Sequence, residues 1–221
     1  MSSKNPKAAL ATCFAEIAKA LGHAQRLEIL EHLAQGERSV DALATRLGVP
    51  IANISQHLRL MRQAGLLTSR REGKRVFYSV SDSSVVDLVT ALHQVGERNL
   101  AGVREILNGY FRDRDTFEPV SRKDLMQRLK LGEVVVLDVR PEDEFAAGHV
   151  PQAINIPLKD LPRRLRQIPK NVEVVAYCRG PYCVFAFEAV ALLRQRGFEV
   201  RRLEDGFPEW RAQGLPVERS A

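Results

Sequence analysis

The feature that most constrains the fold is a change of residue pattern at residues 112–119. This stretch is charged, has no apolar period and ends in a proline, which is typical of a linker. Before it, apolar residues recur at helical spacing, whereas after it short apolar runs alternate with helical stretches. With 221 residues, the chain is long enough for two domains of ordinary size. We therefore predict two domains, residues 1–111 and 120–221, joined by a linker at 112–119.

The first half is predicted to be a mostly-α domain that contains a helix-turn-helix. Two amphipathic helices are expected within residues 10–35, where leucines recur at helical spacing. Ser39, a good N-terminal cap, precedes a short helix that Gly48 ends, and Pro50 opens another helix that runs to Ala64. Two helices separated by so tight a turn are typical of domains that bind DNA.

A β-hairpin and a long helix are expected to follow. Residues 66–71 and 75–80 have strand-like composition and flank a turn at 72–74, so they would form the wing of a winged helix-turn-helix. A single helix is then predicted from Ser83 towards Tyr110. Its apolar stripe is too wide for a lone terminal helix to leave exposed. Contact with a second copy of the chain would cover this stripe, so we expect a homodimer.

Positive charge is concentrated in the first half of the chain. Residues 1–112 hold 15 Lys and Arg against 10 Asp and Glu, whereas the remaining residues hold 18 against 17. A basic domain favours a polyanionic partner. In the fourth helix, one apolar face is expected to pack inward; it consists of Ile51, Ile54, Leu58 and Met61. The opposite face would then be polar and open to a partner.

That partner is predicted to be double-stranded operator DNA. Asn and Gln side chains on the outward face of the fourth helix can pair with adenine, and the basic residues of the hairpin suit phosphates. The residues expected to contact DNA are Asn53, Ser55, Gln56, His57, Arg59, Arg71, Lys74 and Arg75.

These segments resemble a known family. Residues 54–59 (Ile-Ser-Gln-His-Leu-Arg), 63–67 (Gln-Ala-Gly-Leu-Leu) and 72–78 (Glu-Gly-Lys-Arg-Val-Phe-Tyr) are similar to the arsenic-repressor (ArsR-type) winged-helix regulators. The resemblance implies a homodimeric repressor that an inducer releases from DNA. Metal-sensing members carry a Cys-x-Cys pair where this chain has Arg-Ser-Val-Asp at 38–41, and the last helix offers only His93 as a soft ligand. We therefore expect no metal site.

The second half is predicted to be an α/β domain with a parallel sheet and a reactive cysteine. An apolar strand at 172–177 ends at Cys178, and a helix begins near Val184. Backbone amides and the helix dipole at such a loop stabilise a thiolate, so we expect a lowered pKa and a nucleophilic role for Cys178. Arg179 and Arg140 are expected to attract an anionic substrate. The rest of the predicted loop is Gly180, Pro181, Tyr182 and Cys183.

The second half also resembles a known family, the single-domain rhodaneses. The motifs are at 137–140 (Leu-Asp-Val-Arg), 144–151, 153–157, 177–180 (Tyr-Cys-Arg-Gly) and 205–210 with 214–216. The resemblance implies sulfur transfer through a persulfide on Cys178, from a donor such as thiosulfate to an acceptor thiol, without a cofactor. Loop amides would hold the terminal sulfur. Asp138 and Glu144 are expected to organise hydrogen bonds around the loop, and Gln152 and Asp205 stand where the family usually has Gly.

Two of the three cysteines leave alternatives open. Cys183 is either a small packing residue at a helix start or a partner that forms a disulfide with a modified Cys178. Cys13 lies beside Leu10 and Phe14 on the first helix, so packing in the core is favoured for it over a role as a thiol switch.

The leading interpretation is a transcriptional regulator whose rhodanese-like domain performs or senses sulfur transfer. The main alternative is a sulfurtransferase that regulates its own synthesis through the DNA-binding domain. Arsenate reductase or phosphatase chemistry is disfavoured because no Arg stands at 183–185, and an inert scaffold is a further alternative. No apolar run approaches the roughly 20 residues of a membrane helix, and residues 1–6 lack an apolar segment. We therefore expect a cytoplasmic protein that does not bind a membrane.

Overall fold

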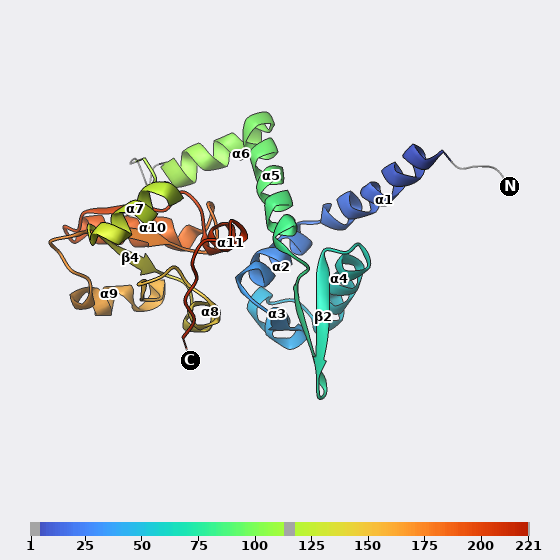
Figure 1. Ribbon diagram of the computed structural model, residues 1–221, viewed down its shortest axis with the longest axis horizontal. Helices are drawn as coiled ribbons and strands as arrows, with labels where there is room; N and C mark the ends of the chain where they lie inside the picture. The colour runs from blue at the N-terminus through green and yellow to red at the C-terminus, as the bar shows by residue number, and fades with distance from the viewer. Residues whose placement is uncertain (1–4, 113–117, 221) are drawn as a thin grey trace. The chain divides into compact units, whose positions relative to one another are not determined.

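The computed structural model describes residues 5–112 and 118–220 (Figure 1). These residues form two compact units that divide between Val85 and Val86. The division falls inside helix α5 (Ser83–Asn99) rather than at the predicted linker. Residues 113–117 of that linker lie outside the described residues, so the proposed domain boundary at 112–119 stays a prediction.

The first unit contains the predicted helix-turn-helix. Its helices are α1 (Pro6–Leu21), α2 (Ala24–Gln35), α3 (Val40–Leu47) and α4 (Ile51–Gln63). Ser39 caps α3, because its hydroxyl accepts a hydrogen bond from the amide of Ala42 at 3.3 Å. Gly48 ends α3 in the left-handed conformation, with φ of 64°, which glycine adopts without steric cost. The helices enclose a fully buried apolar core that includes Ile29, Leu33, Leu43, Ile54, Leu58 and Met61.

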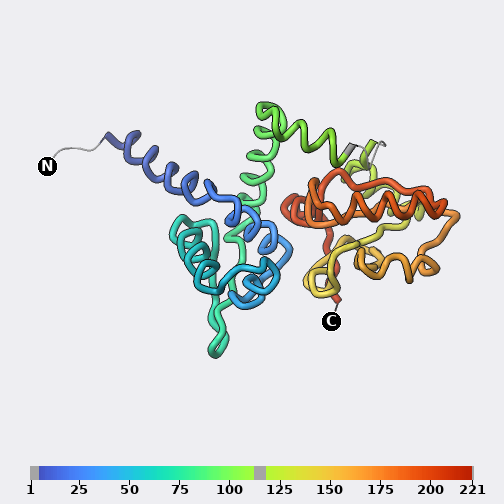
Figure 2. The backbone as a smooth tube through the Cα atoms, turned by 180° about the vertical axis from the view of Figure 1, so that it is seen from behind, coloured from blue at the N-terminus to red at the C-terminus, as the bar shows by residue number. Residues whose placement is uncertain are grey.

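A small antiparallel sheet completes the first unit. Strands β2 (Leu67–Glu72) and β3 (Arg75–Val80) form the predicted hairpin, which extends away from the helices of this unit (Figure 2). The tight turn requires a positive φ, and Gly73 supplies it with φ of 57°. A third strand, β1 (Arg38–Ser39), pairs with β3, so the strand order is β1-β3-β2. Because β1 has two residues, it has no periodicity that sequence could show.

The prediction of one continuous helix from Ser83 towards Tyr110 is wrong, because the helix is interrupted. Helix α5 ends at Asn99, and Leu100 is extended before α6 (Ala101–Ile106) and a π-helical turn (Leu107–Arg112). The Asn99 side chain donates a hydrogen bond to the carbonyl of Val95 at 2.9 Å. An amide side chain that bonds to the backbone in this way competes with helix propagation, which accounts for the break.

The second unit is built on the predicted parallel sheet. Its strands are β4 (Val134–Asp138), β5 (Ile154–Asn155), β6 (Glu173–Tyr177) and β7 (Val200–Arg202), in the order β5-β4-β6-β7. The helices are α7 (Arg122–Leu131), α8 (Glu142–Ala147), α9 (Leu161–Arg164), α10 (Val184–Gln195) and α11 (Phe207–Ala212). Two short 3₁₀ turns, Leu158–Asp160 and Leu165–Gln167, flank α9.

Helices cover both faces of this sheet and create two separate cores. Along β6, Val174 and Ala176 face one side, where they pack with residues of α9 and α10. Val175 and Tyr177 face the other side, with residues of α7 and with Trp210 of α11. This alternation explains why residues 174–177 of β6 form an unbroken apolar run. It also places the residue after β6, Cys178, on the α10 side. Among the described residues, no helix is long and apolar enough to cross a membrane.

Candidate functional site

The candidate active site is the loop that connects β6 to α10. Cys178 follows the last residue of β6, and Cys183 is the N-terminal cap of α10. The loop is pinned at both ends: the Cys178 carbonyl accepts from the Phe207 amide at 3.0 Å, and the Cys183 amide donates to the Gly180 carbonyl at 3.1 Å. Because the loop follows the last residue of β6, it lies at the carboxyl edge of the parallel sheet, where α/β domains commonly bind ligands.

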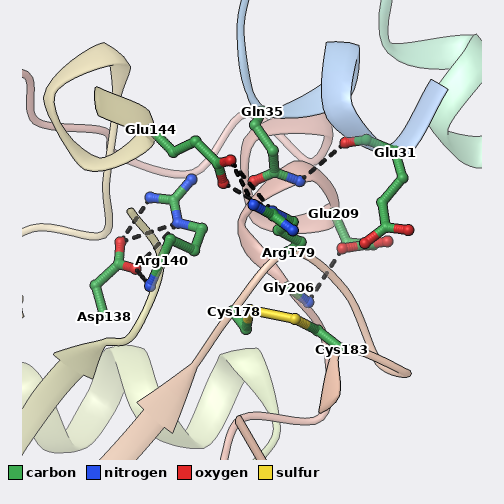
Figure 3. The surroundings of a disulfide bond; sticks show 10 residues. All are labelled: Glu31, Gln35, Asp138, Arg140, Glu144, Cys178, Arg179, Cys183, Gly206 and Glu209. Carbon is green, nitrogen blue, oxygen red and sulfur yellow. Dashed lines mark hydrogen bonds and ion pairs between the residues drawn. A yellow bond between two sulfur atoms is a disulfide. The ribbon is translucent and has the colours of Figure 1, made fainter. Parts of the chain in front are cut away.

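Cys178 and Cys183 are joined by a disulfide bond (Figure 3). Their Cα atoms are 6.1 Å apart, within the usual range for a disulfide. Both residues are buried, with exposed fractions of 1% and 9%. The structure thus favours the second of the two alternatives for Cys183, a partner of Cys178 rather than a packing residue.

The backbone of the loop offers hydrogen-bond donors. In the described part of the chain, the amides of Gly180 and Tyr182 have no hydrogen-bond acceptor. Gly206 approaches the same loop so closely that a Cβ there would lie 2.3 Å from the Gly180 nitrogen. Amides without an acceptor can stabilise an anionic sulfur atom, and the expectation that they hold the terminal sulfur stays a prediction.

A partly buried ion pair holds Arg179, the residue that follows Cys178. The Arg179 guanidinium donates to the Glu144 carboxylate, with Nη2–Oε1 and Nε–Oε2 distances of 2.8 and 3.0 Å. Glu144 is fully buried in α8. Its predicted role of organising the loop agrees with this contact. The expectation that Arg179 attracts an anion is weakened, because Glu144 balances much of its charge.

The structure corrects the expected substrate contact of Arg140. This side chain is 0% exposed and donates to Asp138 and to the Gly148 carbonyl, the latter at 2.8 Å. Asp138 also accepts a hydrogen bond from the Tyr177 hydroxyl. An arginine so enclosed supports the core behind the loop and does not meet substrate. Burial and the neighbouring Asp138 carboxylate together raise the pKa of Tyr177 well above its ordinary value.

Glu209 is a site residue that sequence reasoning missed. Its carboxylate accepts from the Gly206 amide at 3.0 Å, and a Cβ on Gly180 would lie 3.8 Å from its other oxygen. Burial raises the pKa of Glu209 to about 7. In the sequence, the residue stands in an ordinary first turn of a helix, where an acidic side chain needs no special explanation.

The turn after α8 is shaped by His149 and Gln152. The His149 ring nitrogen Nδ1 donates to the Phe145 carbonyl at 2.9 Å, and the ring stacks on the Phe145 ring with centroids 3.6 Å apart. Gln152 has φ of 62°, a conformation that favours glycine. Its own amide donates to the Glu218 carboxylate at 3.1 Å. The turn usually formed with Gly is therefore kept here with Gln.

Tyr182 links the loop to the part of α5 that belongs to the second unit. Its hydroxyl donates to the Glu97 carboxylate, and its ring meets the His93 ring edge-on at 5.1 Å. Burial lowers the pKa of His93. These side chains and Pro181 border a cavity of about 790 Å³. This contact joins segments far apart in the chain, so no local sequence pattern indicates it.

The candidate DNA-binding surface lies on α4 and the hairpin. The predicted contact residues on it are exposed; they are Asn53, Ser55, Gln56, Arg59, Arg71, Lys74 and Arg75. Ile51 was expected to pack inward, yet it is 53% exposed. Its position in the first turn of α4 places it beyond the end of the core formed by Ile54 and Leu58.

His57 differs from the other predicted DNA contacts. Its Nε2 lies 2.7 Å from the Gln25 side-chain oxygen, and its ring is 4.7 Å from the His23 ring. Burial and the charges of His23 and Arg26 lower its pKa. The side chain is therefore turned towards α2, and the structure does not support its role as a base-reading residue.

The expected packing of Cys13 in the core is also wrong. Cys13 is a free, exposed cysteine on α1. The neighbouring Leu10 and Phe14 are 56% and 65% exposed, because no described residue of this unit covers that side of the helix. Within the described ranges, no group of three or more His, Cys, Asp or Glu side chains could hold a metal ion.

Each of the two units contains a segment that matches a known domain family. Residues 21–70 match a helix-turn-helix domain family, and residues 121–213 match the rhodanese-like domain family. The chain is therefore an ArsR-type helix-turn-helix transcriptional regulator that carries a rhodanese-like domain. It belongs to the same family as the HTH-type transcriptional regulator Rv0324 of Mycobacterium tuberculosis, to which it is 42% identical over 97% of this chain and 94% of the relative.

Two further comparisons cover one unit each. A sulfurtransferase of Allochromatium vinosum is 36% identical over 44% of this chain and 92% of its own length. A solved structure from Mycobacterium bovis, described as a homodimeric winged helix-turn-helix DNA-binding domain, is 36% identical. That match covers 46% of this chain and 94% of the other, with a TM-score of 0.42.

Proposed function

We propose that the protein binds operator DNA as a homodimer and accepts sulfur on Cys178, and that the sulfur state of the loop sets its affinity for DNA. The observation that carries the proposal is the position of Cys178 at the carboxyl end of β6, in a loop with unpaired Gly180 and Tyr182 amides among the described residues. The relative named a sulfurtransferase covers this unit and supports the same chemistry.

The sulfur-accepting step needs only the thiolate and a donor. The Cys178 thiolate attacks the outer sulfur of thiosulfate, whose sulfur–sulfur bond breaks. Sulfite leaves with the electron pair of that bond, and Cys178 is left as a persulfide. The amides of Gly180 and Tyr182, which have no acceptor among the described residues, would stabilise the charge on the added sulfur. An acceptor thiol then removes this sulfur.

The DNA-binding part of the proposal rests on α4 and α1. Exposed Asn53 and Gln56 would read base edges, while Lys74 and Arg75 of the hairpin would contact phosphates. The exposed apolar residues Leu10 and Phe14 of α1 would be covered in a homodimer. A cytoplasmic location, where operator DNA would be accessible, belongs to the proposal.

Helix α5 provides a route for coupling. It begins at Ser83, and its later residues His93 and Glu97 contact Tyr182 of the loop. A change in the loop at Cys178 would alter these contacts and so favour one arrangement of α5 over another.

A second candidate function is sulfur transfer as the main activity, with DNA binding serving only autoregulation. The full-length similarity to an HTH-type transcriptional regulator favours regulation. A continuous turnover of thiosulfate at a rate typical of enzymes, without any effect on DNA binding, would favour the enzyme instead.

Sulfite release tests the sulfur chemistry directly. The reduced full-length protein, mixed with thiosulfate, is expected to release one sulfite per chain, and Cys178→Ser none, because a serine hydroxyl is not ionised near neutral pH. Cys13→Ser, which removes the exposed thiol, is the matched control and should behave as the wild type. Equal sulfite release from Cys178→Ser would refute the assignment, and an unreactive wild type would favour an inert scaffold.

A further inference from the structure

The proposed sulfur transfer leaves Cys183 without a role. A persulfide requires one thiol, yet a second cysteine is bonded to Cys178 in this structure. The remaining cysteine of the chain, Cys13, is exposed on α1 and is not part of this loop. The pairing therefore points to a step that comes after sulfur acceptance.

We propose that Cys183 resolves the Cys178 persulfide, so that the loop releases the accepted sulfur as hydrosulfide and closes as a disulfide. The domain would then act as a thiol-dependent persulfide reductase. This inference rests on the proposed sulfur acceptance by Cys178 and adds a product and a reductant to it.

The resolving step balances without any further reactant. The Cys183 thiolate attacks the inner sulfur of the persulfide, which is Sγ of Cys178, and forms the Cys178–Cys183 bond. The bond between inner and outer sulfur breaks, and the outer sulfur leaves as hydrosulfide with the electron pair. Two molecules of a small thiol then reduce the disulfide to two thiols and are themselves oxidised to one disulfide. The cycle thus converts thiosulfate and two thiols into sulfite, hydrogen sulfide and an oxidised thiol.

The position of the two sulfurs selects attack on the inner atom. Because the Sγ atoms of Cys178 and Cys183 are bonded, Cys183 reaches the atom that becomes the inner sulfur of the persulfide. A thiol that reached only the outer sulfur would instead accept that sulfur atom and become a persulfide itself, with release of the Cys178 thiolate. The geometry therefore favours release of hydrosulfide over relay of sulfur along the loop.

The environment of Cys183 suits an attacking thiol. It caps the 12-residue helix α10, and its side chain makes no capping hydrogen bond there. The dipole at this end of the helix favours the thiolate form. The leaving sulfur carries negative charge, and the amides of Gly180 and Tyr182, which have no acceptor in the described residues, lie in the same loop.

The fixed ends of the loop keep the pair within reach. The Phe207 amide holds the Cys178 carbonyl at 3.0 Å, the Cys183 amide holds Gly180 at 3.1 Å, and Arg179 is paired with Glu144. None of these contacts involves the Sγ atom of Cys178 or of Cys183. Opening or closing the disulfide can therefore proceed without unmaking them.

The test is a single turnover of the full-length protein without added thiol. The protein is reduced, freed of reductant under anaerobic conditions and mixed with thiosulfate; sulfite, hydrosulfide and intact mass are then measured. The wild type is expected to release hydrosulfide and sulfite in equal amounts and to end two hydrogen atoms lighter. Cys183→Ser is expected to release the same sulfite without hydrosulfide and to stay one sulfur atom heavier. Cys13→Ser is the matched control and should follow the wild type.

The outcomes separate this inference from the proposed function. Sulfite without hydrosulfide from the wild type, with a stable gain of one sulfur atom, would overturn the resolving step and leave sulfur acceptance intact. No sulfite from the wild type would overturn both. Hydrosulfide from Cys183→Ser equal to that of the wild type would also refute the role of Cys183. Serine is a good helix cap, and sulfite release itself shows that the variant is folded. The wild-type mass decides the question without any variant.

Discussion

At the scale of single residues, burial and pairing determine whether a charged side chain near Cys178 is free to contact a substrate. Arg140 and Arg179 are both near Cys178 in sequence or space, yet Arg140 is enclosed with Asp138 while Arg179 is held by Glu144. Removing one partner of a buried pair leaves an uncompensated charge, which typically costs about 3–5 kcal/mol. These arginines are therefore parts of the framework that holds the loop.

Glu209 provides a prediction about pH. Its folded-state pKa of about 7 lies above the ordinary value of 4.5, so its contribution to stability is complete below pH 4.5 and is lost as pH rises through 7. A shift of this size corresponds to roughly 3 kcal/mol, at about 1.4 kcal/mol per pKa unit. Glu209→Gln has a side chain that stays neutral, so its free energy of unfolding should not fall in this way as pH rises.

Urea unfolding of the full chain at pH 5 and pH 8 would measure this effect. Trp210, the only tryptophan, reports on the second unit through its fluorescence. The free energy of unfolding of the wild type should fall relative to that of Glu209→Gln between the two pH values. Glu188→Gln, at an exposed position of α10, is the control and should follow the wild type. Parallel pH curves for the wild type and Glu209→Gln would contradict the raised pKa.

The position of Cys178 after a strand and before a helix could be predicted from sequence, whereas the contacts around it could not, and its reactivity stays a prediction. Cys178 could be found because a cysteine after an apolar strand and before a helix has few structural explanations. The burial of Arg140 and the contacts of Glu209 and Tyr182 depend on packing between distant segments, for which a single sequence carries no pattern. The contact of His57 with Gln25 could not be predicted for the same reason, since Gln25 lies on another helix.

At the scale of elements, close backbone approach shapes the active loop. A Cβ on Gly206 would lie 2.3 Å from the Gly180 nitrogen and 2.4 Å from the Arg179 carbonyl carbon. Gly206→Ala should therefore push the loop out of place, at a cost of about 1–3 kcal/mol in unfolding free energy, and should reduce the rate of sulfite release. Unfolding by urea and sulfite release from thiosulfate would measure the two effects.

A second glycine variant serves as the control. Gly102 lies in α6, and a Cβ there would meet nothing within 4 Å. Gly102→Ala should leave sulfite release unchanged and should stabilise its helix slightly. If Gly206→Ala behaved like Gly102→Ala, the close approach of α11 to the loop would be ruled out.

Helix α4 and the hairpin are expected to have different roles on DNA. Gln56→Ala should lose about 1–3 kcal/mol of discrimination between operator and random duplexes, because it removes a base contact. Lys74→Ala should weaken binding to all duplexes alike and reduce the salt dependence, because it removes a phosphate contact. Titration of both variants against operator and random DNA at two salt concentrations would measure this. Identical effects of both changes on both DNAs would contradict the assignment.

Element ends were predictable where the backbone needs a special residue. Ser39, Gly48 and Gly73 each satisfy a local requirement, and the structure places a cap, a helix end and a turn there. The break at Leu100 was not predictable, because the apolar pattern continues through it. Two-residue strands such as Arg38–Ser39 are too short to have a pattern.

At the scale of the whole molecule, the change of periodicity along the chain was sufficient to predict two domains. The parallel sheet followed from the apolar runs of β4 and β6, and helices on both faces followed from the same runs. The two compact units instead divide at Val85 and Val86, within a helix, where no linker composition exists.

The most direct test of the account is the affinity of the full-length protein for DNA in defined sulfur states. Duplexes selected from a random pool by the reduced protein would serve as operator, and binding would be compared before and after treatment with thiosulfate. A change of at least tenfold is expected, which requires only about 1.4 kcal/mol of coupling free energy, and Cys178→Ser should show no change. The same operator affinity for treated and untreated wild type would show that sulfur chemistry at Cys178 does not control DNA binding.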